Sequence, residues 1–103
     1  MSSRTQIRFN YRQALVQANE LDSLAKRMDS LAKQRMEQSM QTLSASWKGP
    51  SASAFLVKED ALKKEMKSSA SELRSIASDI RSIARRVYLA EMEALRIANT
   101  RRS

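Results

Sequence analysis

Cysteine and histidine are both absent from this sequence of 103 residues. Without them the chain has no disulfide, no zinc site of the Cys/His type, no thiol nucleophile and no imidazole, the commonest general base. Nothing else in the sequence indicates a catalytic pocket or a phosphate-binding loop. We therefore expect a protein that is not an enzyme and that carries no metal or cofactor. The missing cysteine suits a reducing cytoplasm and an exported protein equally, so it does not decide the compartment.

Glycine and proline occur once each, side by side at Gly49 and Pro50. A β protein of this length needs several turns, and turns draw on Gly, Pro, Asn and Asp. The rest of the chain is rich in residues that favour helices, such as Ala, Leu, Met, Glu, Gln, Lys and Arg. The composition predicts an all-α chain with one corner. Pro50 suits the first helical position there, and Gly49 tolerates the backbone angles of a tight turn.

Long apolar runs are also missing. No segment approaches the roughly 18 apolar residues that a membrane-spanning helix requires, so we expect a soluble chain with no membrane span. The N-terminal residues carry positive charge without an apolar segment behind them, so we expect no ordinary signal peptide.

Apolar residues recur every three or four positions in two long segments. In the first segment they follow a seven-residue spacing from Ile7 to Met28 and then continue towards Trp47. The second segment is more regular, since its apolar residues alternate four and three positions apart from Leu62 to Ile97, as in a coiled coil. The predicted boundaries are about 8–45 for the first helix, 46–50 for the turn, about 50–97 for the second helix and 98–103 for a flexible basic tail.

A short corner between two long helices makes them antiparallel neighbours, so we predict a single helical-hairpin domain over residues 1–103. Two helices alone cannot bury both apolar stripes, and leftover apolar surface usually marks an interface. We therefore expect the hairpin to pair with another hairpin in a four-helix bundle. The predicted interface residues are the large apolar ones of both stripes: Leu21, Leu24, Met28, Leu31, Phe55, Leu62, Met66, Leu73, Ile76, Ile80, Ile83 and Val87.

The corner contains the tripeptide Trp47-Lys48-Gly49 near the middle of the chain, and the aromatic residue Phe55 follows it after several small residues. Together with the two amphipathic arms, this arrangement resembles the WXG family, the ESAT-like small helical proteins that type VII secretion systems of Gram-positive bacteria export. The resemblance implies a protein that is cytoplasmic before export and is then secreted without an ordinary signal peptide. It also implies that Trp47 and Gly49 form half of a secretion signal.

The other half of that signal, as the resemblance implies, is a Tyr followed four residues later by an acidic residue. Tyr88 is suitably placed, but position 92 is Met, and Glu91 and Glu93 flank it. On a helix these two carboxylates point about 100° to either side of the expected direction. The sequence therefore leaves two interpretations open for Tyr88: a degenerate export motif with Glu91 and Glu93, or an aromatic residue at the rim of an interface. The departure favours a partner that carries the complete signal.

Basic residues outnumber acidic ones by 19 to 11, and the net charge is +8. The charges are spread over both helices, as on solvated helix faces. Because a homodimer would double this like charge, we expect a complex with an acidic helical partner. The resemblance also implies the helical N-terminal domain of a larger secreted toxin as a partner, and contact with the type VII secretion ATPase. A homodimeric secreted effector of the same family is the alternative.

Nucleic-acid binding is an alternative of another class. The net charge fits it, and Arg81, Arg85 and Arg86 could follow phosphates. However, the basic residues do not converge on one short helix that could enter a groove, and the aromatic residues form no platform for bases. We therefore do not favour nucleic acid as the partner.

Two carboxylates, Glu59 and Asp60, lie near the start of the predicted second helix. There they interact favourably with the helix macrodipole and require no catalytic explanation.

Overall fold

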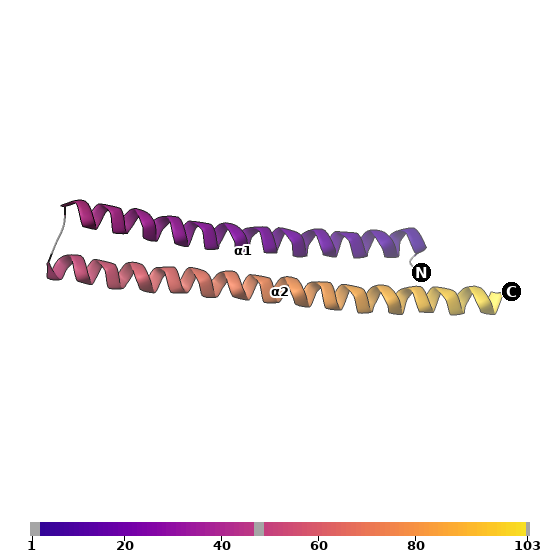
Figure 1. Ribbon diagram of the computed structural model, residues 1–103. Coiled ribbons are helices and arrows are strands. Elements are labelled where there is room, and N and C mark those ends of the chain that lie inside the picture. The colour runs from indigo at the N-terminus through magenta and orange to yellow at the C-terminus, as the bar shows by residue number, and fades with distance from the viewer. Residues whose placement is uncertain (1–2, 47–48, 103) are drawn as a thin grey trace. The chain divides into compact units, whose positions relative to one another are not determined.

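The computed structural model describes residues 3–46 and 49–102, which form two long helices (Figure 1). Helix α1 spans Arg4–Ser46 and helix α2 spans Pro50–Arg102. No strand occurs in this part of the chain. The predicted all-α helical hairpin is therefore confirmed.

Helix α1 begins at Arg4, earlier than the predicted start at about residue 8. Ser3 explains the difference because it caps the helix. Its Oγ accepts a hydrogen bond from the backbone N–H of Gln6 at 3.1 Å, and its carbonyl oxygen accepts one from the N–H of Ile7 at 2.9 Å. A serine in this position satisfies backbone donors that the helix itself leaves unpaired.

Helix α2 begins at Pro50 and continues to Arg102, past the predicted end at about residue 97. The preceding Gly49 has a φ of +112°, and its carbonyl oxygen accepts the first helical hydrogen bond, from Ser53 N–H at 3.2 Å. No Gly or Pro follows Ile97, so nothing in the sequence stops the helix there. Residues 98–102 of the expected flexible tail are therefore part of α2.

Contacts group the chain into two units, each built from one segment of α1 and one antiparallel segment of α2. We call Met1–Asp22 with Ser75–Ser103 the terminal unit, and Ser23–Arg74 the corner unit. The termini belong to the first, and the turn belongs to the second (Figure 1).

The buried residues of both units are mostly alanines. In the terminal unit Ala18 and Ala77 are completely buried, and in the corner unit Ala25 and Ala70 are completely buried and Ala32 almost so. No large side chain is fully buried among the described residues. Each unit thus contains a seam of small side chains, which lets two helix backbones approach closely, while most of the larger apolar side chains remain partly outside.

Polar contacts between α1 and α2 flank the seam. In the terminal unit, the Arg81 guanidinium pairs with Asp22 and donates a hydrogen bond to Asn19 Oδ1 at 2.8 Å. In the corner unit, Arg74 pairs with Asp29. Such pairs are partly exposed and contribute modestly to stability, but they fix how the two helices are aligned.

Candidate interaction surfaces

An exposed apolar row lies on α2 in the terminal unit. Ile76 and Ile83, seven residues apart, are each about half exposed, and Val87 continues the row. Each isoleucine directly precedes a seam alanine, Ala77 or Ala84, and successive residues of a helix point about 100° apart. The row therefore lies beside the face that α2 uses against α1 and is free to contact something else.

The corner unit repeats this arrangement on α1. Leu24 and Leu31 are exposed, and each directly precedes a buried alanine, Ala25 or Ala32. Leu31 also lines an open groove of about 280 Å³. Its other lining residues are the half-buried Leu62 and Met66 of α2 and three polar residues of α1, Gln34, Arg35 and Gln38. The apolar surface here spans both helices of the unit.

We use the name apolar face for the twelve residues that the sequence predicts as an interface. Half of them are exposed, namely Leu24, Leu31, Phe55, Ile76, Ile83 and Val87. The other half are half-buried, namely Leu21, Met28, Leu62, Met66, Leu73 and Ile80. None is fully buried within the hairpin, so every one retains surface that a partner could cover. Their assignment to a partner interface stays a prediction.

The sequence analysis missed the seam alanines of α2. Ala70 and Ala77 on α2 belong to no predicted stripe, although both are completely buried. A repeated tripeptide contains three of the six alanines that are buried among the described residues, and the half-buried Ala84: Ser-Leu-Ala occurs at 23–25 and 30–32, and Ser-Ile-Ala at 75–77 and 82–84. In each copy the large residue faces outward and the alanine inward.

The turn motif is described only in part. Trp47 lies outside the described residues, so its proposed place in a secretion signal stays a prediction. Gly49 is exposed, and its φ of +112° is one that L side chains rarely adopt. A methyl group added there would contact nothing, so backbone conformation and not crowding explains why glycine occupies the position.

Tyr88 packs inside the hairpin. Its ring stacks on that of Tyr11 from α1, with centroids 4.8 Å apart and planes 25° from parallel. Both tyrosines and the half-buried Glu91 line a small cleft of about 140 Å³ in the terminal unit. The tyrosine proposed for export thus also joins the two helices of this unit.

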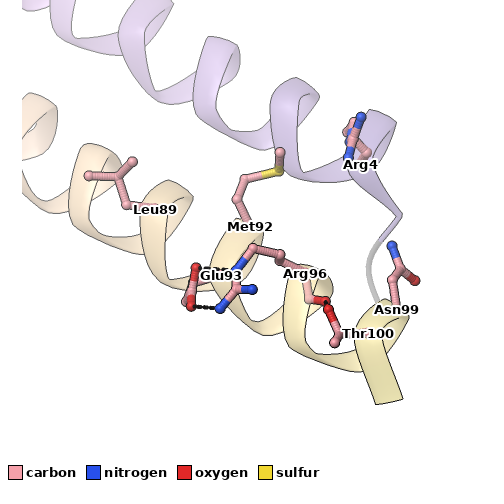
Figure 2. A pocket seen from close by; sticks show the side chains of 7 residues that line it. All are labelled: Arg4, Leu89, Met92, Glu93, Arg96, Asn99 and Thr100. Atoms are coloured by element: carbon pink, nitrogen blue, oxygen red, sulfur yellow. Dashed lines mark hydrogen bonds and ion pairs between the residues drawn. The ribbon is translucent and has the colours of Figure 1, made fainter. Parts of the chain in front are cut away.

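Glu93 and Met92 lie on a second, larger pocket of the terminal unit, of about 560 Å³ (Figure 2). Glu93 receives two hydrogen bonds from Arg96, at 3.0 Å and 2.6 Å. Hydrogen bonding by Arg96 lowers the pKa of the Glu93 carboxyl. Met92, the residue four after Tyr88, points towards α1 in Figure 2 and contributes a thioether where the family pattern has a carboxylate. The structure therefore separates Glu91, beside Tyr88, from Glu93, which pairs with Arg96.

The corner unit contains a buried carboxylate, Glu59, that the sequence analysis assigned to the helix macrodipole. That assignment is wrong, because the macrodipole acts within the first turn and Glu59 is the tenth residue of α2. Glu59 is 8% exposed and accepts hydrogen bonds from Arg35 Nε at 3.0 Å, Arg35 Nη2 at 3.2 Å and Ser39 Oγ at 3.3 Å. The hydrogen bonds from Arg35 lower the pKa of the Glu59 carboxyl, and the same contact raises the pKa of Arg35. Ala52 is buried seven residues earlier on the same face of α2, so Glu59 occupies a seam position. This arrangement is a clamp between α1 and α2.

Several kinds of site are missing from the described residues. No group of three acidic side chains that could hold a metal ion occurs among them. Over the same residues, neither helix includes a segment with the length and hydrophobicity needed to cross a bilayer.

Comparison with known proteins identifies the family. The chain matches the model of the WXG100 family, described as proteins of 100 residues with WXG, over residues 6–92. Comparison with curated proteins and with solved structures finds no match. The family match covers most of both helices and the corner between them, the features in which the WXG tripeptide and the alanine seam lie. The chain belongs to the WXG100 family.

Proposed function

We propose that this protein works as a helical partner in type VII secretion, docking a second WXG-like hairpin through its apolar face. The WXG100 family is associated with type VII secretion and consists of small helical proteins. In this proposal the chain is either a targeting adaptor or a substrate that is secreted together with its partner. It is cytoplasmic before export.

The observation that carries the proposal is the apolar face itself. Ile76 and Ile83 stay about half exposed, although Ala77 beside Ile76 is completely buried and Ala84 beside Ile83 is half-buried. Covering the exposed half of one such side chain contributes on the order of 1 kcal/mol, so several of them supply enough for stable association. In a four-helix bundle each helix contacts two neighbours on adjacent faces. Helix α2 has two such faces, the alanine seam and the isoleucine row.

The net charge favours a partner that is not a second copy. A chain of charge +8 repels its copies, whereas an acidic hairpin or the acidic helical domain of a secreted toxin would associate faster. The homodimeric secreted effector is the second form of the proposal. Only the apolar face supports this second form, and an apolar face can dock a copy of the same chain as well as a different hairpin.

The export signal is the finer part of the proposal. Trp47 and Gly49 form one half, and the region of Tyr88 with Glu91 and Glu93 forms an incomplete second half. Because Met92 replaces the acidic residue, the partner supplies the complete signal to the type VII secretion ATPase. The stacking of Tyr88 on Tyr11 supports a mainly structural use of this tyrosine.

The test combines an interface variant with a matched control. In the variant Ile76→Ser/Ile83→Ser the row loses two apolar side chains that are not needed for the seam. The control Val57→Ser changes an exposed valine of the corner unit that is 19 residues from Ile76 and thus about 100° around α2 from the row. Light scattering would measure the mass of the protein in solution, both alone and mixed with the small helical proteins encoded beside it. Export would be measured as the amount of protein in the culture medium.

We expect the Ile76→Ser/Ile83→Ser variant to lose at least about tenfold in association affinity, because two side chains each lose on the order of 1 kcal/mol of burial. The Val57→Ser control should associate and be exported as the wild type is. A wild-type chain that stays monomeric with every neighbouring product and never reaches the medium would refute the proposal. Association of the wild type with itself alone would identify the homodimer.

A further inference from the structure

The corner unit contains an open groove whose lining is entirely charged, and we call it the basic groove. Its volume is about 650 Å³, and it is lined by Lys33 and Asp29 of α1 and by Lys63, Lys67 and Arg74 of α2. Arg74 pairs with Asp29. The three lysines form no ion pair within the part of the chain that the structure describes.

This groove and the groove that Leu31, Leu62 and Met66 line lie on opposite sides of the seam. On α1, Leu31 and Lys33 are the neighbours of the buried Ala32, so they point about 100° to either side of it. On α2, the directions of the side chains can be measured from the completely buried Ala70, which marks the face towards α1. Met66 lies about 40° to one side of it, whereas Arg74 lies about 40° to the other. A partner that covers the apolar face therefore leaves the basic groove open.

We propose that the basic groove binds an acidic helical segment of a partner protein, at a site separate from the apolar face. The cations of α2 occur at Lys63, Lys67 and Arg74, spaced by four and seven residues. Residues at this spacing form one row along a helix. A helix with carboxylates at the same spacing presents a matching row, and Lys33 on the opposite wall of the groove provides a second contact to it.

The composition of the groove favours carboxylates over a nucleic-acid backbone. Its lining includes no aromatic side chain on which a base could stack. Lysine provides three of the four cations, whereas arginine is the residue best suited to phosphate geometry. The Asp29 carboxylate also lies in the groove, where it would repel a continuous row of phosphates. A protein helix can avoid Asp29 by placing an uncharged residue opposite it.

The test uses the full chain and two labelled helical peptides of about 20 residues, a length at which alanine-rich helices form in water. The row peptide has glutamates spaced by four and seven residues, and the rearranged peptide has the same composition with the glutamates distributed around the helix. A duplex DNA of similar length serves as the polyanion probe. Binding would be measured by fluorescence anisotropy at about 50 mM and about 300 mM salt, since surface charge pairs weaken with ionic strength.

Two double variants distinguish binding by the groove cations from attraction by the overall positive charge of the chain. Lys33→Gln/Lys67→Gln removes two groove cations, one from each helix. Arg27→Gln/Lys58→Gln removes two exposed cations of the same unit that do not line the groove, so both variants lose the same net charge. Circular dichroism melts would confirm that both variants fold as the wild type does.

We expect the row peptide to bind more tightly than the rearranged peptide, and the Lys33→Gln/Lys67→Gln variant to bind it about tenfold more weakly, as for the loss of two exposed ion pairs. The Arg27→Gln/Lys58→Gln variant should stay within about twofold of the wild type. The Ile76→Ser/Ile83→Ser variant should bind the peptide normally, so the two proposed surfaces can fail separately. Equal losses in both charge variants, equal binding of the two peptides, or tighter binding of the DNA would overturn the proposal.

Discussion

Replacing Ala77 with leucine tests whether the alanine seam is closely packed. Ala77 is completely buried in the terminal unit, and the change adds three carbon atoms at a point where the two helices meet. Alanine and leucine have nearly the same helix propensity, so the substitution changes packing and hardly affects the helix itself. The seam can accommodate the larger side chain only if the helices move apart or the leucine adopts a strained rotamer.

The expected cost follows from how little space surrounds this position. Inserting methylene groups into a well-packed core costs about 1–3 kcal/mol. For a chain of this size 1 kcal/mol corresponds to roughly 4–8 °C in the melting temperature. We therefore expect Ala77→Leu to melt about 10 °C below the wild type, for a loss of about 2 kcal/mol.

Thermal unfolding followed by far-ultraviolet circular dichroism measures this effect. The control is Ser78→Leu, which adds a leucine at the next residue, where the side chain is exposed. Surface substitutions of this kind stay within about 0.5 kcal/mol of the wild type. Because association stabilises a folded chain, both variants should be melted at several protein concentrations and compared at the lowest.

An Ala77→Leu variant that melts within about 2 °C of the wild type would refute the seam, since a closely packed position cannot accept three carbons at so small a cost. An equal drop in the melting temperature of Ser78→Leu would also refute the close packing of the seam, because it would show that a larger apolar side chain anywhere on this part of α2 is destabilising.

Three further predictions concern an ion pair, a backbone angle and a pair of stacked rings. The folded-state pKa of Glu59 is lowered, so its pairing with Arg35 stabilises the fold above the unfolded carboxyl pKa of about 4.3 and is lost as pH falls through the folded value. Wild-type melts from pH 7 to pH 3 should therefore lose more stability than those of Glu59→Gln, and parallel pH profiles would exclude this role. Gly49→Ala should lower the free energy of unfolding in urea by about 1–3 kcal/mol because of the positive φ, and an unchanged value would mean that the turn adopts another conformation. In a double-mutant cycle of Tyr11→Leu and Tyr88→Leu, the stacked rings should show a coupling of about 0.5–1.5 kcal/mol, and additive losses would contradict the stacking.

The positive φ of Gly49 also affects how the secretion signal can be tested. Loss of export in Gly49→Ala can result from a destabilised corner as easily as from a damaged signal. A comparison with Trp47→Ala, made at measured and similar stability, separates the two causes. Export that falls in proportion to folding would assign the motif a structural role.

The hairpin could be predicted from the sequence because its only breakers, Gly49 and Pro50, lie together between two long periodic segments. The pairing of α1 with α2 in detail could not. The strongest periodic signal on α2 comes from Ile76, Ile83 and their neighbours, and large apolar residues are the natural candidates for a core. The structure instead places Ala70 and Ala77 at the centre, because alanine lets helix backbones come closer than isoleucine does.

The clamp between Arg35 and Glu59 was unpredictable for a different reason. The two residues are 24 positions apart, and by itself each is compatible with a charge on a solvated helix face. Only the alignment of α1 with α2 brings them together, and one sequence contains no information on that alignment. The seven-residue spacing of Glu59 from Ala52 becomes informative once Ala52 is known to be buried.

The composition of the seam explains why this chain should depend on a partner. Hydrophobic stabilisation is roughly proportional to the apolar area removed from water, and an alanine contributes a single methyl group. Each unit therefore gains little from its buried residues, while Leu31 and Ile83 retain about half of their surface in contact with water. A clamp such as Arg35 with Glu59 can hold the helices in alignment without adding much net stability, since charged pairs lose solvation when they form. The larger part of the available hydrophobic free energy is thus released only when another surface covers the apolar face, which couples the stability of the hairpin to its association.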